Sequence, residues 1–175
     1  MDQQIESKTE NAEKRAFFEA MVKAHGPRLY AHIRAVVINH DDADDVLQNT
    51  LLKAWTSIDR FRNEAAVYTW LHRIAINEAL QFLRKKKWQR MLWPSFKSSE
   101  KVDFQGLSSE QVLLKLVHAL EQLPPQQRAI FGMRYFDETP FAEIAGILSI
   151  SQGAARASYH QAAKKVESFL QYNLE

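Results

Sequence analysis

The chain has 175 residues, of which 46% are hydrophobic and 25% charged, and its formal net charge is +2. This length allows one ordinary domain or two small ones, and the composition is that of a folded protein. The absence of cysteine excludes disulfides, thiolate metal sites and a cysteine nucleophile. With only five glycines and five prolines, helices are favoured over turn-rich β-structure. The first residues lack the apolar core of a signal peptide, and we expect a cytoplasmic protein.

The uneven distribution of charge predicts two units. Residues 1–93 carry 15 basic and 12 acidic groups together with all four tryptophans, whereas residues 110–175 carry six basic and seven acidic groups. Between them, residues 94–108 contain four serines, a proline and a glycine, a composition typical of a flexible linker. We therefore expect an all-α protein with one small helical domain over residues 1–93, a linker over 94–108 and a second domain over 109–175.

Apolar spacing predicts four helices in the first unit. The first covers about residues 12–25, and Pro27 suits the first turn of the second, which continues to Val37. The acidic run HDDADD supplies aspartate caps for a third helix that ends near Ile58. A fourth helix starts near Ala66 and ends in the basic tail RKKKWQR.

The second unit also has a four-helix pattern. Ser108 and Gln111 form a candidate capping box for its first helix, and Pro124-Pro125 separate that helix from the next. Thr139-Pro140 begin the short helix FAEIAGIL, and the tight connection SISQG leads to a last helix that ends near Tyr172. Two helices joined by such a turn are typical of a helix-turn-helix, although packing hairpins share this pattern.

The stretch YTWLHRIAINEALQFLRKKKWQR is the most informative. At helical spacing, Trp70, Arg73, Asn77, Gln81 and Arg84 lie on one face, followed by the cations of RKKK. Cations neutralise phosphates, amides pair with base edges, and aromatic rings stack on unpaired bases. The face therefore indicates nucleic-acid binding. A solvated helix end, where cations favour the C-terminal dipole, is the alternative.

Two other segments leave their interpretation open. The HDDADD run lacks the glycine-containing spacing of a calcium loop, so its aspartates either cap a helix or, with Gln48 and Lys53, dock a partner protein. The last helix starts SQGAARASYHQAAKK and has few donors for bases, so it reads DNA weakly or only packs. Phosphate-binding glycine loops and nucleophile elbows are absent. We expect no catalytic residue, cofactor, metal site or small-molecule substrate.

Three segments resemble one known family. DDADDVLQNTLLKAWTSIDRFR, AAVYTWLHRIAINEALQFLRKKK and LEQLPPQQRAIFGMRYFDETPFAEIAGILSISQGAARASYHQAAKKV are similar, in order and spacing, to the bacterial extracytoplasmic-function (ECF) sigma factors of RNA polymerase. The resemblance covers nearly the whole chain. It implies a sigma region 2 helical bundle, a region 4 helix-turn-helix, and a non-enzymatic protein that binds core RNA polymerase and directs promoter-specific transcription initiation.

The resemblance also implies partners and site residues. Core polymerase would be bound through its β′ clamp helices and β flap, promoter DNA through both regions, and a membrane-associated anti-sigma factor is a further partner known in the family. The polymerase-binding positions are Asp44, Asp45, Gln48, Asn49, Leu52 and Trp55. The minus-ten positions are Arg62, Asn63, Tyr68, Trp70, Arg73, Asn77, Gln81, Arg84, Lys85 and Lys86. The minus-thirty-five positions are Ser151, Gln152, Gly153, Arg156, His160 and Lys164.

The match departs from the family pattern at a few positions. Asn49 replaces a usual glutamate, and Ala154, Ser158 and Gln161 remove donors or cations expected on the last helix. Recognition of the minus-thirty-five element is therefore expected to be weak or different in sequence. The alternatives are a stand-alone helix-turn-helix regulator, a sigma-derived protein-interaction module and, with no catalytic constellation to support it, a helical enzyme.

Overall fold

The structure, a computed structural model, describes residues 2–61, 67–92 and 109–172. These ranges are helical throughout, apart from short connections, as the sequence predicted. The helices are α1 (Asp2–Val37), α2 (His40–Ser57), the short 3-10 helix η1 (Ile58–Arg60), α3 (Val67–Leu92), α4 (Ser109–Glu121), α5 (Pro125–Tyr135), α6 (Phe141–Leu148) and α7 (Gln152–Tyr172). The expected linker 94–108, the capping serine Ser108 and the site residues Arg62 and Asn63 lie outside the described ranges.

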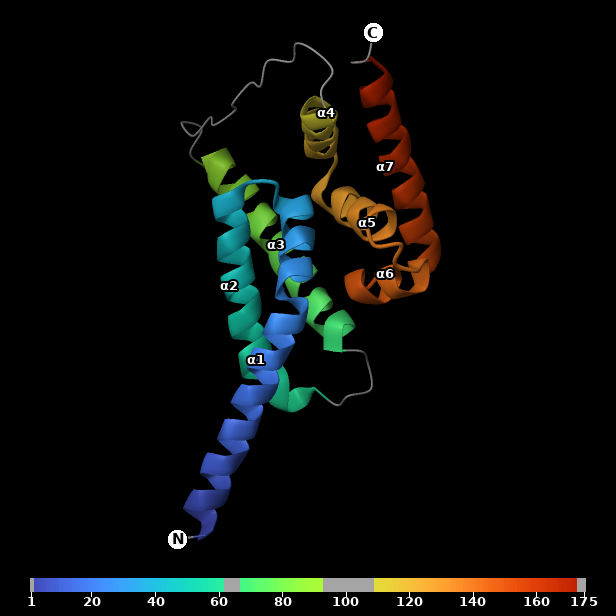
Figure 1. The fold of residues 1–175 in the computed structure, drawn as a ribbon. Helices are drawn as coiled ribbons and strands as arrows, with labels where there is room; N and C mark the ends of the chain where they lie inside the picture. Colours follow the sequence, from blue (N-terminus) through green and yellow to red (C-terminus); the bar gives the residue numbers. More distant parts are fainter. Residues whose placement is uncertain (1, 62–66, 93–108, 173–175) are drawn as a thin grey trace.

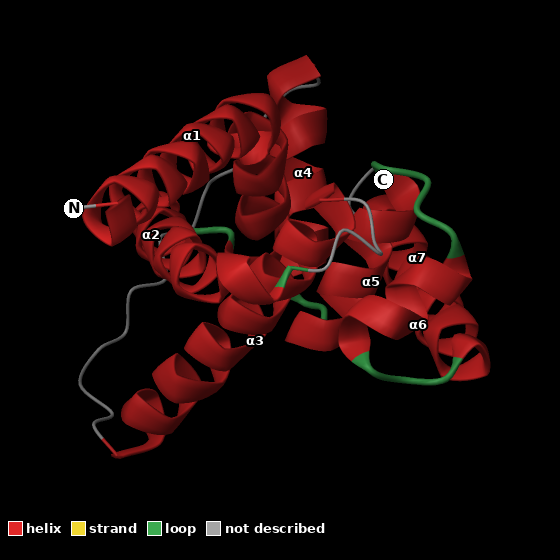
Figure 2. Cartoon of the chain, turned by 90° about the horizontal axis from the view of Figure 1, so that it is seen from below, coloured by secondary structure: helices red, strands yellow, loops and turns green. Residues whose placement is uncertain are grey.

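The helices form two groups that touch each other (Figure 1). Helices α1, α2 and α3 pack pairwise into one bundle, and α7 packs against α4, α5 and α6 in the other. Helix α5 also contacts α1 and α3, and α6 contacts α3, so the second group leans on the first (Figure 2). The N-terminal end of α1 projects beyond the bundle (Figure 1).

The prediction of two helices before residue 38 was wrong, because α1 runs without interruption through Pro27. A proline inside a helix removes one backbone hydrogen bond and costs about 3 kcal/mol. That cost is offset because Met21, Leu29, Ile33 and Val36, spaced eight, four and three residues apart, are buried on one continuous face. Breaking the helix at Pro27 would place half of this face out of register with the core.

Helix α2 begins at His40, the first residue of the acidic run HDDADD. Its N-cap is Asn39, whose side-chain oxygen accepts a hydrogen bond from the backbone N–H of Asp42 at 3.0 Å. The prediction of an aspartate cap was therefore wrong. Asp41 and Asp42 lie in the first turn, where their charge interacts favourably with the helix dipole.

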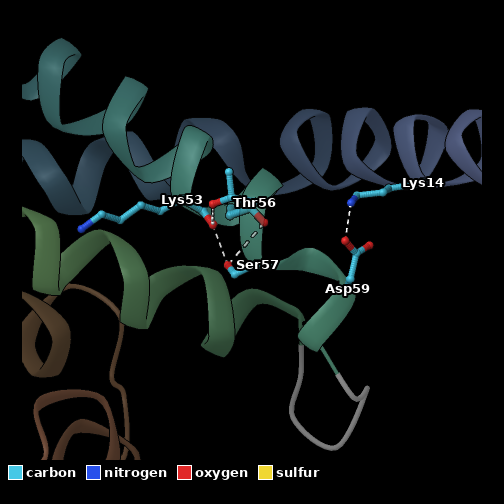
Figure 3. A network of polar contacts seen from close by, with 6 residues as sticks. Lys14, Lys53, Thr56, Ser57 and Asp59 are labelled. Carbon is cyan, nitrogen blue, oxygen red and sulfur yellow. Dashed lines mark hydrogen bonds and ion pairs between the residues drawn. The ribbon is translucent and has the colours of Figure 1, made fainter.

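The last turn of α2 is capped by its own side chains, and the η1 turn that follows it is held to α1 (Figure 3). The hydroxyl groups of Thr56 and Ser57 donate to the carbonyl oxygen of Lys53, and Lys14 of α1 forms an ion pair with Asp59 at 2.5 Å. The positioning of this end matters because the chain turns here toward α3.

The second group follows the predicted pattern with one exception. Pro124 is the N-cap of α5 and Pro125 its first residue, as expected. The N-cap of α6 is Pro140 rather than Thr139, and Thr139 is buried. Between α6 and α7, Ser149 adopts a left-handed conformation (φ 54°), which ends α6 and starts the turn of the helix-turn-helix.

The main hydrophobic core includes residues of both groups. Leu29, Ile33 and Ile76 from the first group lie in the same buried cluster as Ile130 and Ile144 from the second. A smaller cluster, which contains Leu120, Phe131 and Val166, joins α4, α5 and α7. The two predicted units are thus packed against each other through shared apolar surface.

Candidate nucleic-acid and polymerase interface

Helix α3 presents an exposed polar stripe over four turns. Its members are Arg73, Asn77, Gln81, Arg84 and Trp88, spaced four, four, three and four residues apart, and all of them are exposed. The opposite side of the helix carries Leu71, Ala75, Ile76 and Ala79, all buried in the core. We call the first set the α3 stripe. Burial of the apolar side fixes the direction in which the stripe points.

The α3 stripe is free of negative charge. Glu78 is the helix's one carboxylate, and its side chain, 14% exposed, lies 2.5 Å from Nζ of Lys53 in α2. Beyond the stripe, Lys85 and Lys87 are exposed, while Lys86 is partly buried and forms an ion pair with Asp42. The surface therefore combines fixed cations with amides, a chemistry suited to a nucleic-acid strand.

Two aromatic residues predicted to contact DNA lie inside the fold. The Trp70 ring is half-buried, packs against the core, and has its centroid 5.1 Å from that of Phe61. Tyr68 is half-buried, its ring lies 4.4 Å from the guanidinium carbon of Arg28, and burial raises the pKa of its hydroxyl group to about 12. Both rings support the start of α3, whereas the exposed aromatic ring of the helix is Trp88.

The start of α3 meets the second group in a polar cluster that the sequence did not predict. Nε2 of His32 in α1 lies 2.8 Å from Oδ2 of Asp137, and an Arg28 nitrogen lies 3.5 Å from the other carboxylate oxygen. The centroid of the His72 ring lies 4.4 Å from that of His32, with the two ring planes tilted by 59°, and the Tyr68 ring lies 5.3 Å from His72. Burial lowers the pKa of His72 to about 3, and it also lowers the pKa of His32, against the opposing effect of Asp137. His72 is therefore neutral at physiological pH.

Helix α6 covers the first turns of α3. The hydroxyl group of Thr69 donates to Oε1 of Glu143 at 2.8 Å. A guanidinium nitrogen of Arg73 lies 3.7 Å from the position that a Cβ atom on Gly146 would occupy. Helix α6 therefore covers the N-terminal end of the α3 stripe more than its C-terminal end.

A groove of about 420 Å³ lies beside this contact, between α1, α4 and α5. Its lining is mostly apolar and includes Ile38, Leu116, Leu120 and Phe136. Asp137 and His32 of the polar cluster lie at its wall. The groove thus runs along the line where the two helix groups meet.

Helix α2 presents a second exposed face. Asp45, Gln48, Asn49 and Leu52 are exposed, and the Leu52 side chain reaches 63% exposure. The two remaining residues of the predicted polymerase-binding set are engaged within the chain, because Asp44 pairs with His40 at 3.1 Å and Trp55 packs edge-on against Phe18. The structure thus brings four of the six positions together on one open surface.

The start of α7 is open to solvent. The hydroxyl oxygen of Ser151 accepts a hydrogen bond from the backbone N–H of Ala154, which caps the helix. All six predicted residues at this end are exposed: Ser151, Gln152, Gly153, Arg156, His160 and Lys164. Ala155, Ala162 and Val166 form the buried side. Residues 152–165 contain no carboxylate.

Comparison with known proteins agrees with this geometry. The model of Sigma-70 region 2 matches residues 21–89, and that of Sigma-70 region 4 matches residues 113–166. The chain belongs to the sigma-70 family. Among curated relatives, it is 27% identical to RNA polymerase sigma factor SigV of Bacillus subtilis, over 86% of this chain and 89% of that protein. It is 25% identical to the ECF RNA polymerase sigma-E factor of Escherichia coli, over 97% and 94% of the two chains.

A solved structure shares the fold. The sigma factor RpoE in complex with the anti-sigma factor NepR from Bartonella quintana superposes with a TM-score of 0.74 at 24% sequence identity, over 88% of this chain and 96% of that one. The family matches and the curated relatives identify the chain as an ECF-type sigma factor that directs promoter-specific transcription initiation.

Within this sigma factor, the region 2 match contains α2, the C-terminal part of α1 and most of α3, and the region 4 match contains α5, α6 and parts of α4 and α7. Sequence reasoning missed Trp88 as an exposed ring and missed the cluster around Asp137. The spacing of Trp88 from Arg84 was a usable signal for the first. The second has no local signal, because its residues lie up to 109 positions apart.

Proposed function

We propose that the α3 stripe of this sigma factor contacts the minus-ten element. The observation that carries this proposal is a carboxylate-free exposed face with Asn77 at its middle, flanked by Arg73 and Gln81. Asn77 has the donor and acceptor needed to hold an extruded base, and Arg84 and Lys85 are placed to neutralise the neighbouring phosphates. Lys86 contributes charge from its partly buried position. Tyr68 and Trp70 support the helix from below rather than stack on bases.

The polymerase contact is proposed for the exposed face of α2. Asp45, Gln48, Asn49 and Leu52 would dock on the β′ clamp helices, while Asp44 and Trp55 hold the helix in place through His40 and Phe18. Region 4 would contact the β flap. An exposed leucine among polar side chains is typical of a protein-docking surface.

The start of α7 is proposed to contact the minus-thirty-five element. Arg156, His160 and Lys164 would approach phosphates, and Gln152 a base edge. Ala154 and Ala157, also exposed, add only methyl groups. The contribution of α7 to sequence selection is therefore expected to be smaller than that of α3.

Promoter binding requires the two regions to separate. The minus-ten and minus-thirty-five elements are centred roughly 25 base pairs apart, which is about 85 Å at 3.4 Å per base pair. In the structure α6 lies directly on α3, joined by the hydrogen bond between Thr69 and Glu143. The closed arrangement cannot span that distance, so we infer that the free protein is closed and opens on polymerase.

We further infer that the sigma factor catalyses no reaction itself. The cluster of His32, His72 and Asp137 has residue types found in hydrolases, but it is buried between two packed helix groups and includes no serine. The raised pKa of Tyr68 makes its hydroxyl group a poor nucleophile.

No described helix is long and apolar enough to cross a membrane. We infer a cytoplasmic protein, and a membrane-associated anti-sigma factor is a further proposed partner.

Promoter-directed transcription tests the proposal. The purified chain is added to core polymerase from its own organism with genomic fragments as template, and the run-off products are sequenced. We expect transcripts from discrete start sites. Asn77→Ala should reduce their amount by about 10-fold or more, because the extruded base loses its hydrogen-bonding partner in the protein. The Lys85→Ala/Lys86→Ala double variant should reduce transcription from all promoters by a similar factor. Glu19→Ala, an exposed position on α1, is the control and should match the wild type.

Two results would contradict the proposal. Polymerase binding without start sites would support the protein-interaction module. Tight sequence-specific binding of duplex DNA by the full chain without polymerase would support the helix-turn-helix regulator.

A further inference from the structure

Trp88 is unusually exposed for its residue type. Its side chain is 67% exposed, whereas Trp55 and Trp70 are half-buried and packed against neighbouring rings. Trp88 has no ring or cation–π contact with any other residue whose side chain the structure describes. A large apolar side chain that is mostly exposed and makes no such contact among the described residues has no evident role in stabilising this fold.

The surroundings of Trp88 are cationic. It follows Arg84 by four residues and therefore continues the α3 stripe by one turn. Arg84, Lys85 and Lys87 are exposed next to it, and the buried apolar residues that the structure describes on α3, namely Leu71, Ala75, Ile76 and Ala79, lie on the other side of the helix. An apolar protein groove would be matched by neighbouring apolar side chains, because charged residues are depleted at the centre of protein interfaces. A single indole among exposed cations instead matches a nucleic-acid strand, whose phosphates pair with cations and whose bases stack on aromatic rings.

We propose that Trp88 stacks on a base of the promoter strand whose extruded base is held at Asn77. The proposal rests on the function proposed above. Eleven residues separate the two side chains, which is about 16 Å along a helix that rises 1.5 Å per residue. Bases at B-form spacing lie about 3.4 Å apart along one strand, so a strand that follows α3 at this spacing reaches Trp88 about five nucleotides from Asn77.

This assignment gives the two ends of the α3 stripe different tasks. The N-terminal end is partly covered by α6, through Thr69 and Arg73. Trp88, at the far end, is exposed even in the closed arrangement. The stacking ring and the adjacent cations are therefore accessible whether or not the two regions have separated.

The test compares four variants in the holoenzyme at one promoter found by the transcription assay. Trp88→Ala and Trp88→Leu remove the aromatic face, Trp88→Phe keeps one, and Gln89→Ala is an exposed neighbour about 100° around the helix. Measured quantities are the lifetime of the open complex and the fluorescence of 2-aminopurine placed from three to seven nucleotides away from the base at Asn77. We expect Trp88→Ala and Trp88→Leu to shorten the lifetime about 5- to 100-fold, the range for loss of one stacked base. Trp88→Phe and Gln89→Ala should stay within about threefold of the wild type.

The fluorescence of 2-aminopurine about five nucleotides from the base at Asn77 should be quenched in complexes of the wild type and of Trp88→Phe, but not in those of Trp88→Leu. Equal lifetimes in all variants, with an active wild type, would overturn the Trp88 assignment and leave the proposed function intact. So would weaker binding of core polymerase by Trp88→Ala with an unchanged lifetime, because the ring would then be a protein contact. An inactive wild type would overturn both proposals.

Discussion

The two DNA-facing helices of this sigma factor are built differently. Helix α3 displays a long stripe that includes two arginines, two amides and an indole, and its other side supplies the core of region 2. Helix α7 displays a short start, where Arg156 and His160 are exposed and the exposed residues Gly153, Ala154 and Ala157 are small. Helix α3 is partly covered by the other region, whereas the start of α7 is open.

This difference indicates where sequence selection and control reside. The stripe on α3 has the side chains for base recognition, and α6 lies against its first turn through Thr69 and Arg73. The start of α7 is accessible at all times but has few groups that distinguish bases. Control of the first helix by the second region is therefore the property to test, and the contact between the regions is the place to break it.

The largest effect is expected from the shared core. Ile144 of α6 is fully buried in the cluster that also contains Leu71 and Ile76 of α3. Ile144→Ala should lower the free energy of unfolding by about 3 kcal/mol, because it removes buried methyl groups and leaves a cavity. All four tryptophans lie in residues 1–93, so their fluorescence reports on region 2 alone. If the two regions stabilise each other, the midpoint of urea unfolding measured by this fluorescence shifts to a lower urea concentration in Ile144→Ala.

Val166→Ala is the matched control for this prediction. Val166 lies in the smaller cluster of α4, α5 and α7. Its loss should change the helical circular-dichroism signal with little change in the tryptophan midpoint. An unchanged tryptophan midpoint in Ile144→Ala would mean that the two regions unfold independently.

A smaller effect is expected from Asp137, which joins the regions through polar contacts. Its carboxylate, 11% exposed, lies against His32 and Arg28. Asp137→Asn removes the charge and should weaken the contact between the regions by about 1–3 kcal/mol. Because the chain has no cysteine, one label can be placed at Glu19 and another at Ser158 to measure their separation. We expect a larger fraction of long distances in the variant.

Glu138→Gln controls for charge at the neighbouring position. Glu138 is exposed, and its backbone carbonyl rather than its side chain accepts from Arg134. A distance distribution in Asp137→Asn identical to the wild type would show that apolar packing alone holds the regions together.

Local features of the fold could be predicted from the sequence. The helix pattern, the Pro124-Pro125 boundary and the exposed faces of α3 and α7 depend on spacing and on residues near one another in the chain. Pro27 was misleading because a first-turn proline and a tolerated internal proline have the same local sequence. Only the burial of Met21 and Leu29 on one face distinguishes them.

Long-range features could not be predicted. Trp70 and Trp88 are both aromatic residues of one helix, and the sequence favoured Trp70 for DNA because it starts the stripe. The structure places Trp70 against Phe61 and leaves Trp88 exposed. The contact of Asp137 with His32 and of Glu143 with Thr69 depends on how the regions pack, which no spacing within either region reveals.

Near neutral pH, the smallest effect is expected from protonation of the buried histidines at the same contact. Folding lowers the pKa of His72 from 6.5 to about 3, because burial disfavours the charged ring. Between about pH 6.5 and 3, His72 therefore binds a proton in the unfolded chain but not in the folded one. The stability linked to His72 is complete above pH 6.5 and declines by about 1.4 kcal/mol per pH unit as the pH falls toward 3. His32, whose pKa is also lowered, adds in the same direction.

Replacing His72 with phenylalanine separates this contribution from the rest. The buried Nε2 atom of His72 has no hydrogen-bond partner among the described residues, so His72→Phe should leave stability at pH 7.5 within about 1 kcal/mol. Between pH 6.5 and 5 the variant should lose less stability than the wild type, measured as the urea midpoint at each pH. His160→Gln, at an exposed position on α7, should keep the wild-type slope. Equal slopes of stability against pH for His72→Phe and the wild type would contradict this prediction. His72 would then be protonated in the folded protein, and acid would destabilise this contact through other groups.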